Sequence, residues 1–121
     1  MTTTSSLPPW GKSLAMNLFE CDHSTLITAA SLQSYIDMII PAIGMVAHGP
    51  THIERFGSGD LEGFSAMQFI ETSSITIHAD EVDNRCFVDI FTCKDFDTED
   101  AIEKTREYFK AKTVTSHVMD R

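Results

Sequence analysis

The segment from residue 73 to residue 93 places the strongest constraint on the fold. Residues 73–79 (SSITIHA) alternate between polar and apolar side chains, and residues 85–93 (RCFVDIFTC) are rich in β-branched and aromatic residues. The residues between them, EVDN at 81–84, are typical of a hairpin connection. The segment therefore predicts two antiparallel strands, the second of them buried on both faces.

Two helices and further strands are predicted around this hairpin. Residues 31–44 carry apolar side chains at helical spacing behind a Ser31 cap, and Pro41 is expected to kink or end that helix. Residues 98–111 predict a second helix that is acidic in its first turn and turns Ile102, Thr105, Tyr108 and Phe109 to the core. Strands are also predicted at residues 12–21, 51–56, 62–71 and 113–119. This order indicates an α+β two-layer sandwich, with an antiparallel sheet and both helices on one face.

Composition limits the classes of partner. The chain has 121 residues, enough for one domain, and a formal net charge of -9. Such an acidic chain is a poor match for nucleic acid or an anionic membrane surface, and it is compatible with a small cationic ligand. The three cysteines are widely spaced, which indicates reduced thiols and a cytoplasmic location, and no zinc-type ligand pattern predicts a metal site.

The chain is predicted to consist of a flexible tail at residues 1–11 and a single domain at residues 12–121. The tail is polar and contains prolines, and it lacks the basic and apolar regions of a signal peptide. No apolar run approaches the length that a membrane-spanning helix needs.

The hairpin brings a hydroxyl and a thiol to one end of the sheet. If residues whose numbers sum to about 166 lie opposite each other, Ser73 faces Cys93. His78 is five residues from Ser73, a span of about 16–17 Å along a straight strand, so it needs a bend, another role or a dimer partner to join them. Taken singly, each residue also has a structural interpretation: a turn serine, a core cysteine and a satisfied strand histidine.

Two motifs taken together resemble the bacterial and archaeal S-adenosylmethionine decarboxylase proenzymes. That family carries a Glu-Ser-His-apolar-Ser/Thr-Ile-His stretch and, further along, an apolar-Asp-apolar-Phe-Thr-Cys stretch. The first is matched here by Ser73 and the ITIH of residues 75–78, and the second by VDIFTC at residues 88–93. Weaker likenesses are FECD at residues 19–22, Arg55-Phe56 and GFS at residues 63–65, so that the resemblance covers roughly residues 12–116.

The resemblance implies a self-processing decarboxylase. The hydroxyl of Ser73 would attack the preceding carbonyl, and the chain would split to leave a pyruvoyl group derived from Ser73, which forms a Schiff base with S-adenosylmethionine in spermidine and polyamine synthesis. His78 would assist ester breakdown, and Cys93 would donate a proton. Phe56, Ser65 and Glu81 would contact the substrate or support its site. The family is usually homodimeric, with sites at the interface.

The motifs depart from the family pattern at several positions. Thr72 stands where the family has Glu, Ser74 where it has His, and ADEV at residues 79–82 where it has Thr-Trp-Pro-Glu, while a few extra residues separate Phe56 from Ser65. Two alternatives therefore stay open: a pyruvoyl decarboxylase of another amino acid, and an unprocessed, non-catalytic homologue that binds a small ligand or partner.

Overall fold

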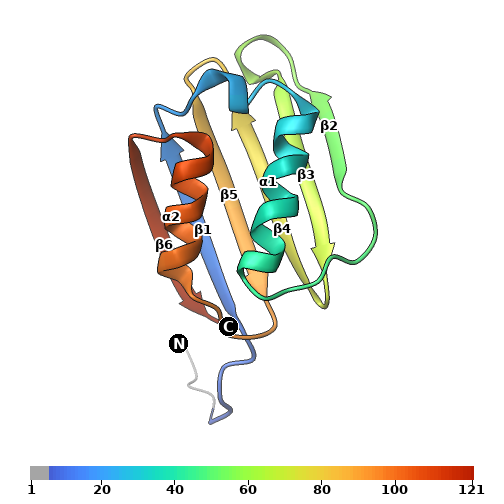
Figure 1. Cartoon of the computed structure of the whole chain (residues 1–121), viewed down its shortest axis with the longest axis vertical. Coiled ribbons are helices and arrows are strands. Elements are labelled where there is room, and N and C mark those ends of the chain that lie inside the picture. The colour runs from blue at the N-terminus through green and yellow to red at the C-terminus, as the bar shows by residue number, and fades with distance from the viewer. Residues whose placement is uncertain (1–5) are drawn as a thin grey trace, which may run out of the picture.

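The computed structural model describes residues 6–121, which form one sheet and two α-helices (Figure 1). The strands are β1 (Lys12–Phe19), β2 (His52–Phe56), β3 (Gly63–Ile70), β4 (Ser73–Asp80), β5 (Arg85–Thr92) and β6 (Thr113–Asp120). The helices are α1 (Ala29–Ala42) and α2 (Thr98–Phe109), and short 3-10 turns lie at His23–Thr25 and Gly59–Leu61.

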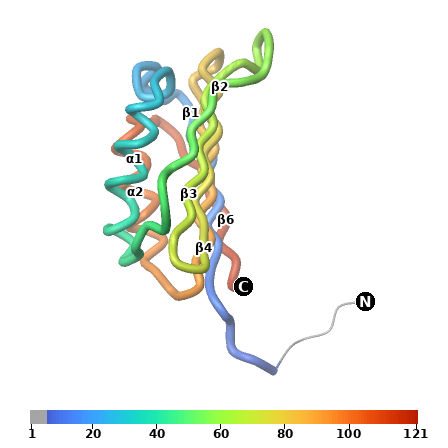
Figure 2. Tube along the Cα trace, turned by 90° about the vertical axis from the view of Figure 1, so that its right-hand side faces the viewer, coloured from blue at the N-terminus to red at the C-terminus, as the bar shows by residue number. Residues whose placement is uncertain are grey.

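The sheet is antiparallel throughout, with the strand order β2-β3-β4-β5-β1-β6. Both helices cover the same face of the sheet, and the edge-on view shows the opposite face bare (Figure 2). The predicted α+β two-layer sandwich is therefore confirmed.

Burial alternates along the central strands because only one face is covered. Ile75 and Ile77 of β4 and Val88 and Ile90 of β5 are fully buried beneath the helices. The alternate residues form what we call the open face, which includes Ser65, Met67 and Phe69 of β3, Ser74, Thr76 and His78 of β4, and Arg85, Phe87, Asp89 and Phe91 of β5.

The prediction that the second hairpin strand is buried on both faces is wrong. Asp89 is exposed, and Phe87 and Phe91 are only half-buried. Aromatic residues on the open face gave the sequence its apolar character, although no helix covers them.

The register of the β4–β5 hairpin differs from the prediction by one residue. Asp80 pairs with Arg85 and Ser74 with Phe91, so Ser73 and Cys93 are not directly opposed. The turn closes around residues 81–84, where Asn84 takes a left-handed conformation (φ 53°). The carbonyl of Asn84 accepts a hydrogen bond from the Cys21 amide (2.9 Å), and its side chain bonds Nδ1 of His23 (2.8 Å), which fixes the turn against the end of β1.

The helices form as expected, with small shifts of boundary. The cap of α1 is Thr28, whose hydroxyl accepts a hydrogen bond from the Ser31 amide (3.1 Å), whereas Ser31 itself lies inside the first turn. Pro41 lies in the last turn, and the helix ends one residue later at Ala42. On α2, Thr105 and Phe109 are buried as predicted.

The prediction that four residues of α2 face the core is confirmed. Ile102 and Tyr108 are half-buried and pack against the core, and Ala101 is buried beside Thr105 and Phe109. The Thr105 hydroxyl bonds Tyr35 of α1 (2.7 Å), which joins the two helices inside the core.

Part of the predicted tail is attached to the sheet. The amides of Trp10 and Gly11 donate to the carbonyl of Arg121 (2.5 and 3.0 Å), and the Trp10 ring lies 5.6 Å from that of Phe91. Residues 1–5 of the predicted tail lie outside the described residues. Within residues 6–121, no helix has the length and apolar character needed to cross a membrane.

Candidate active site

The peptide link from Thr72 to Ser73 follows a tight turn between β3 and β4. Ile70 pairs with Ser73, so Glu71 and Thr72 alone make the connection. Thr72 has φ 50°, in the left-handed region, which is unfavourable for a β-branched residue because Cβ crowds the following carbonyl. The conformation stores strain of about 1–2 kcal/mol beside the carbonyl of this link.

The side chain of Ser73 is held at the same position. Ser73 is buried, and its hydroxyl oxygen accepts a hydrogen bond from the backbone amide of Cys93 (2.7 Å). The Cys93 amide is the donor in this bond, so it fixes the position of the Ser73 oxygen. The hydroxyl hydrogen of Ser73 is not used in the bond and is available for transfer. Ser73 and Cys93 are thus brought together, although their register differs from the predicted one.

The Cys93 thiol is the most readily ionised of the three cysteines. Its pKa is lowered, first because the Thr72 hydroxyl can hydrogen-bond the thiolate and next because the Ser73 hydroxyl can do so. The protonated thiol is oriented toward the Glu71 carbonyl (3.5 Å). Burial instead raises the pKa of Cys21 to about 11 and that of Cys86 well above its ordinary value. Only Cys93 therefore combines access to a cavity with a stabilised thiolate.

These groups line a cavity of about 750 Å³ that we call the Ser73 cavity. Thr72, Ser73 and Cys93 line it together with residues of the open face. The remaining lining residues are His48, Phe69, Ile70, Glu71, Ser74 and Phe91. Sequence reasoning did not identify His48, because no motif connects it to Ser73. It lies here because its amide bonds the Phe69 carbonyl (2.9 Å) at the end of β3.

A second polar group lies nearer the other end of the open face. Ser65 pairs with His78 across β3 and β4, and the Ser65 hydroxyl bonds Nδ1 of His78 (2.8 Å). Both residues, together with Phe56, line a cavity of about 300 Å³ that we call the His78 cavity, and they also line an adjoining cavity of about 410 Å³. The structure therefore groups three of the sequence-predicted residues here.

The two groups are separate within one subunit. Ser73 is on the strand face that the helices cover, whereas His78 is on the open face, and the five-residue offset amounts to about 16–17 Å. A single chain thus presents the nucleophile with its thiol at one place and the histidine with its serine at another.

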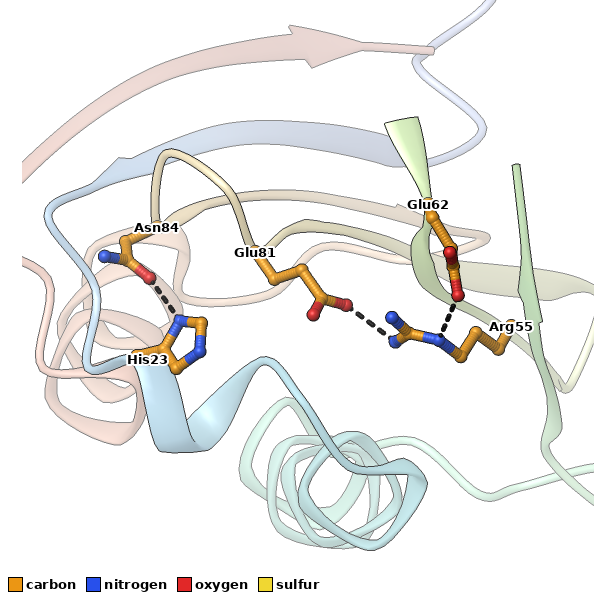
Figure 3. Close-up of polar contacts among 5 residues, drawn as sticks. All are labelled: His23, Arg55, Glu62, Glu81 and Asn84. Atoms are coloured by element: carbon orange, nitrogen blue, oxygen red, sulfur yellow. Dashed lines mark hydrogen bonds and ion pairs between the residues drawn. The ribbon is translucent and has the colours of Figure 1, made fainter. Parts of the chain in front are cut away.

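Glu81 lies apart from both groups. Its carboxylate forms an ion pair with Nη1 of Arg55 (2.6 Å), while Nε of Arg55 bonds Glu62 (2.8 Å), as Figure 3 shows. The Arg55 guanidinium lies over the ring of Phe64, which contacts the core on the helix side. Substrate contact by Glu81 stays a prediction.

The acid beside His78 is Asp80, which sequence reasoning missed. Asp80 lines the His78 cavity and bonds Nε of Arg85 (2.7 Å). The period of two along a strand could have identified it, since residues 78 and 80 share a face whereas residue 81 does not.

Comparisons with known proteins agree with this architecture. A family model described as S-adenosylmethionine decarboxylase matches residues 12–121. The structure of an adenosylmethionine decarboxylase from Aquifex aeolicus VF5 superposes with a TM-score of 0.81 at 16% identity, covering 95% of this chain and 92% of that one. At that identity the superposition shows the shared fold alone, while the family match spans nearly the whole chain. The chain therefore belongs to the S-adenosylmethionine decarboxylase family.

Proposed function

We propose that this chain cleaves itself between Thr72 and Ser73 and then acts as a pyruvoyl-dependent S-adenosylmethionine decarboxylase that supplies spermidine synthesis. The observation that carries the proposal is the left-handed Thr72 (φ 50°) directly before a serine whose hydroxyl oxygen is fixed by the Cys93 amide (2.7 Å). A strained acyl group and a positioned nucleophile are what an intramolecular acyl shift needs.

In the proposed cleavage of the Thr72–Ser73 link, each step uses a group that the chain itself supplies, apart from water. The hydroxyl oxygen of Ser73 attacks the carbonyl carbon of Thr72, the C–N bond breaks, and the hydroxyl proton passes to the freed nitrogen, which leaves an ester. The imidazole of His78 then accepts the Ser73 α-proton, and the ester C–O bond breaks to expel the Thr72 carboxylate. Water replaces the nitrogen of the resulting unsaturated residue, and ammonia leaves. Relief of the strain at Thr72 favours the first of these steps.

The pyruvoyl group formed in this way would lie in the Ser73 cavity, whose volume of about 750 Å³ leaves room for a substrate. When present, it supplies a carbonyl that condenses with the substrate amine and accepts the electrons released as carbon dioxide leaves. Cys93 lines the same cavity and holds a transferable proton on sulfur, which suits it to protonate the substrate carbon.

The proposal includes a homodimer formed through the open face. This face exposes large apolar side chains, among them Met67 (44%) and Phe69 (50%), which a monomer leaves in water. A two-fold axis through the face would lay the Ser73 cavity of one subunit against the His78 cavity of the other. Each complete site would then contain Ser73 and Cys93 from one chain and Ser65, His78 and Phe56 from its partner.

A second candidate is a decarboxylase with the same mechanism that acts on another amino acid. The observation in its favour is Asp80, which occupies the His78 cavity at a position where the family pattern has tryptophan. A carboxylate in place of an indole changes which substrate group the cavity accommodates, and a basic amino acid is the natural alternative.

The test is the intact mass of the purified protein. We expect two fragments separated before residue 73, the second beginning with a pyruvoyl group. Ser73→Ala should leave the chain whole without unfolding it, whereas Ser74→Ala should still be cleaved. A wild-type chain that never converts would contradict the proposal and favour a non-catalytic homologue. Release of labelled carbon dioxide from S-adenosylmethionine, arginine and ornithine then separates the two candidate enzymes.

A further inference from the structure

The loop between β2 and β3, residues 57–62, forms one wall of the His78 cavity. Asp60, Leu61 and Glu62 line this cavity next to Phe56. In the edge-on view the loop leans out beyond the open face, away from the helices (Figure 2). In the proposed dimer, the loop would therefore contact a substrate held between the Ser73 cavity of one subunit and the His78 cavity of the other.

The loop has a defined shape. Gly57 and Gly59 both take left-handed conformations (φ 92° and 59°), and a Cβ on Gly57 would lie only 2.5 Å from the Leu61 carbonyl oxygen. The Leu61 amide donates to the Ser58 carbonyl (3.1 Å), which closes a single 3-10 turn at the tip. The backbone of the loop therefore has a defined conformation, which fixes this wall of the His78 cavity.

Arg55 fixes the base of the loop. It bonds Glu62 at the end of the loop (2.8 Å) and Glu81 in the β4–β5 turn (2.6 Å), as Figure 3 shows. The Arg55 guanidinium also lies 5.1 Å from the centre of the Phe64 ring. Because the planar guanidinium of Arg55 bridges the two carboxylates, it holds the loop and the β4–β5 turn at a fixed distance from each other.

Three carboxylates line the His78 cavity, and two of them already have arginine partners. Glu62 is bonded by Arg55, and Asp80 by Arg85 (2.7 Å). In the part of the chain that the structure describes, no hydrogen bond or ion pair engages the Asp60 carboxylate. Phe56 and Phe87 supply apolar walls beside it. Arg55 occupies only Oε2 of Glu62 and Arg85 only Oδ2 of Asp80, so Asp60 is the lining acid with both oxygens available to a ligand.

We propose that Asp60 accepts hydrogen bonds from a donor group of the substrate at the end remote from the reacting amine. The group is a hydroxyl, an amino group or a guanidinium, and Asp60 then selects the substrate of the proposed decarboxylase, on which this inference rests. Arg55 acts as a positioning residue, since it holds the loop that carries Asp60.

The test is Asp60→Asn, which keeps the size of the side chain and removes its charge, with Glu107→Gln on the exposed side of α2 as the charge-matched control. Loss of a charge-assisted hydrogen bond should raise KM about 10- to 100-fold, with kcat and self-cleavage nearly unchanged. Glu107→Gln should change none of these. S-adenosylmethionine, arginine and ornithine are assayed in parallel, and the effect should fall on the substrate that wild-type protein prefers.

A KM unchanged by Asp60→Asn would overturn the inference and leave the proposed function standing. If wild-type protein does not cleave, the proposed function fails, and the inference is then tested by calorimetry on intact Ser73→Ala protein with the same three compounds. Binding that weakens about 10- to 100-fold in the Asp60→Asn background supports it. Equal binding, or no binding of any of the three, overturns it.

Discussion

Among single residues, Thr72 matters most for the proposed self-cleavage. A left-handed conformation is tolerated by glycine and asparagine and resisted by threonine, yet threonine is placed directly before the proposed cleavage point (φ 50°). Strain of this kind persists only where the surrounding structure enforces it, and here the β3–β4 pairing on both sides does so.

Thr72→Gly should relieve this strain. Measured by urea unfolding in the uncleavable Ser73→Ala background, the free energy of unfolding is expected to rise by about 1 kcal/mol. In the chain that retains Ser73, cleavage followed on denaturing gels should slow, because the acyl group no longer begins part of the way to the transition state.

Lys110→Gly is the matched control, since Lys110 has a similar φ of 52° at the end of α2, away from the Ser73 cavity. It should stabilise the fold and leave the rate of cleavage unchanged. Cleavage by Thr72→Gly at the wild-type rate would show that strain does not contribute.

Cys93 should be the thiol that alkylating agents modify first. Its pKa is lowered by hydrogen bonds from Thr72 and then Ser73, whereas burial raises the pKa of Cys21 to about 11. In the uncleaved Ser73→Ala protein, which keeps the Thr72 hydroxyl and therefore the larger cause, iodoacetamide near neutral pH should label Cys93 alone, as shown by peptide mass mapping. Adding Thr72→Val should move the pH midpoint of labelling upward, because the largest cause of the lowered pKa is removed.

The sign of the pH dependence follows from the direction of the shift. Because the folded-state pKa of Cys93 is lowered, the thiolate stabilises the fold at pH values above the unfolded pKa, and this contribution is lost as the pH falls through the folded pKa. Proton donation by the thiol runs in the opposite sense and declines as the pH rises through the folded pKa. A labelling midpoint that Thr72→Val leaves in place would contradict the assigned cause.

At the scale of elements, most of the fold could be predicted because each strand and helix carries its own pattern. The strands, both helices and the hairpin at residues 81–84 follow from periodicity, caps and turn residues. The errors were the hairpin register, the burial of β5 and the capping residue of α1. Each depends on which pairings and which face the other elements leave available, and a local pattern does not contain that information.

The candidate site, too, could be predicted only in part from the sequence. The proximity of Ser73 and Cys93 survived a one-residue error in register, because the Cys93 amide, one residue beyond β5, bonds the Ser73 oxygen (2.7 Å). Likeness to the family motif indicates Glu81, whereas Asp80 shares the cavity with His78 because the side chains of a strand alternate. Asp60 had no sequence signal, since its place depends on how the loop folds.

At the scale of the whole molecule, the proposed dimer makes a prediction that a monomer cannot satisfy. Ser73→Ala and His78→Ala chains should each fail to complete cleavage alone. Co-expressed, they should form mixed dimers in which one of the two sites has both residues intact. Roughly a quarter of all sites should then convert, as measured by intact mass.

If sedimentation shows dimers but the co-expressed sample contains no fragment, the shared site is contradicted. Ser73 and His78 would then act within one subunit or in different steps of the reaction. A Ser73→Ala/His78→Ala double variant co-expressed with a Glu107→Gln chain is the control. In that mixture each site of a mixed dimer carries one substitution, so only the homodimers of the Glu107→Gln chain should convert.

Local patterns were sufficient to predict the strands, the helices, the sandwich architecture and the family, because periodicity and motifs are properties of short stretches of the chain. Three outcomes required the folded structure: that Thr72 is strained, that the helices leave the face of His78 uncovered, and that Asp60 lines the cavity with His78. Those outcomes depend on strand pairing, on the face that the helices leave bare and on the path of a loop, all of which are set by contacts between residues far apart in the chain.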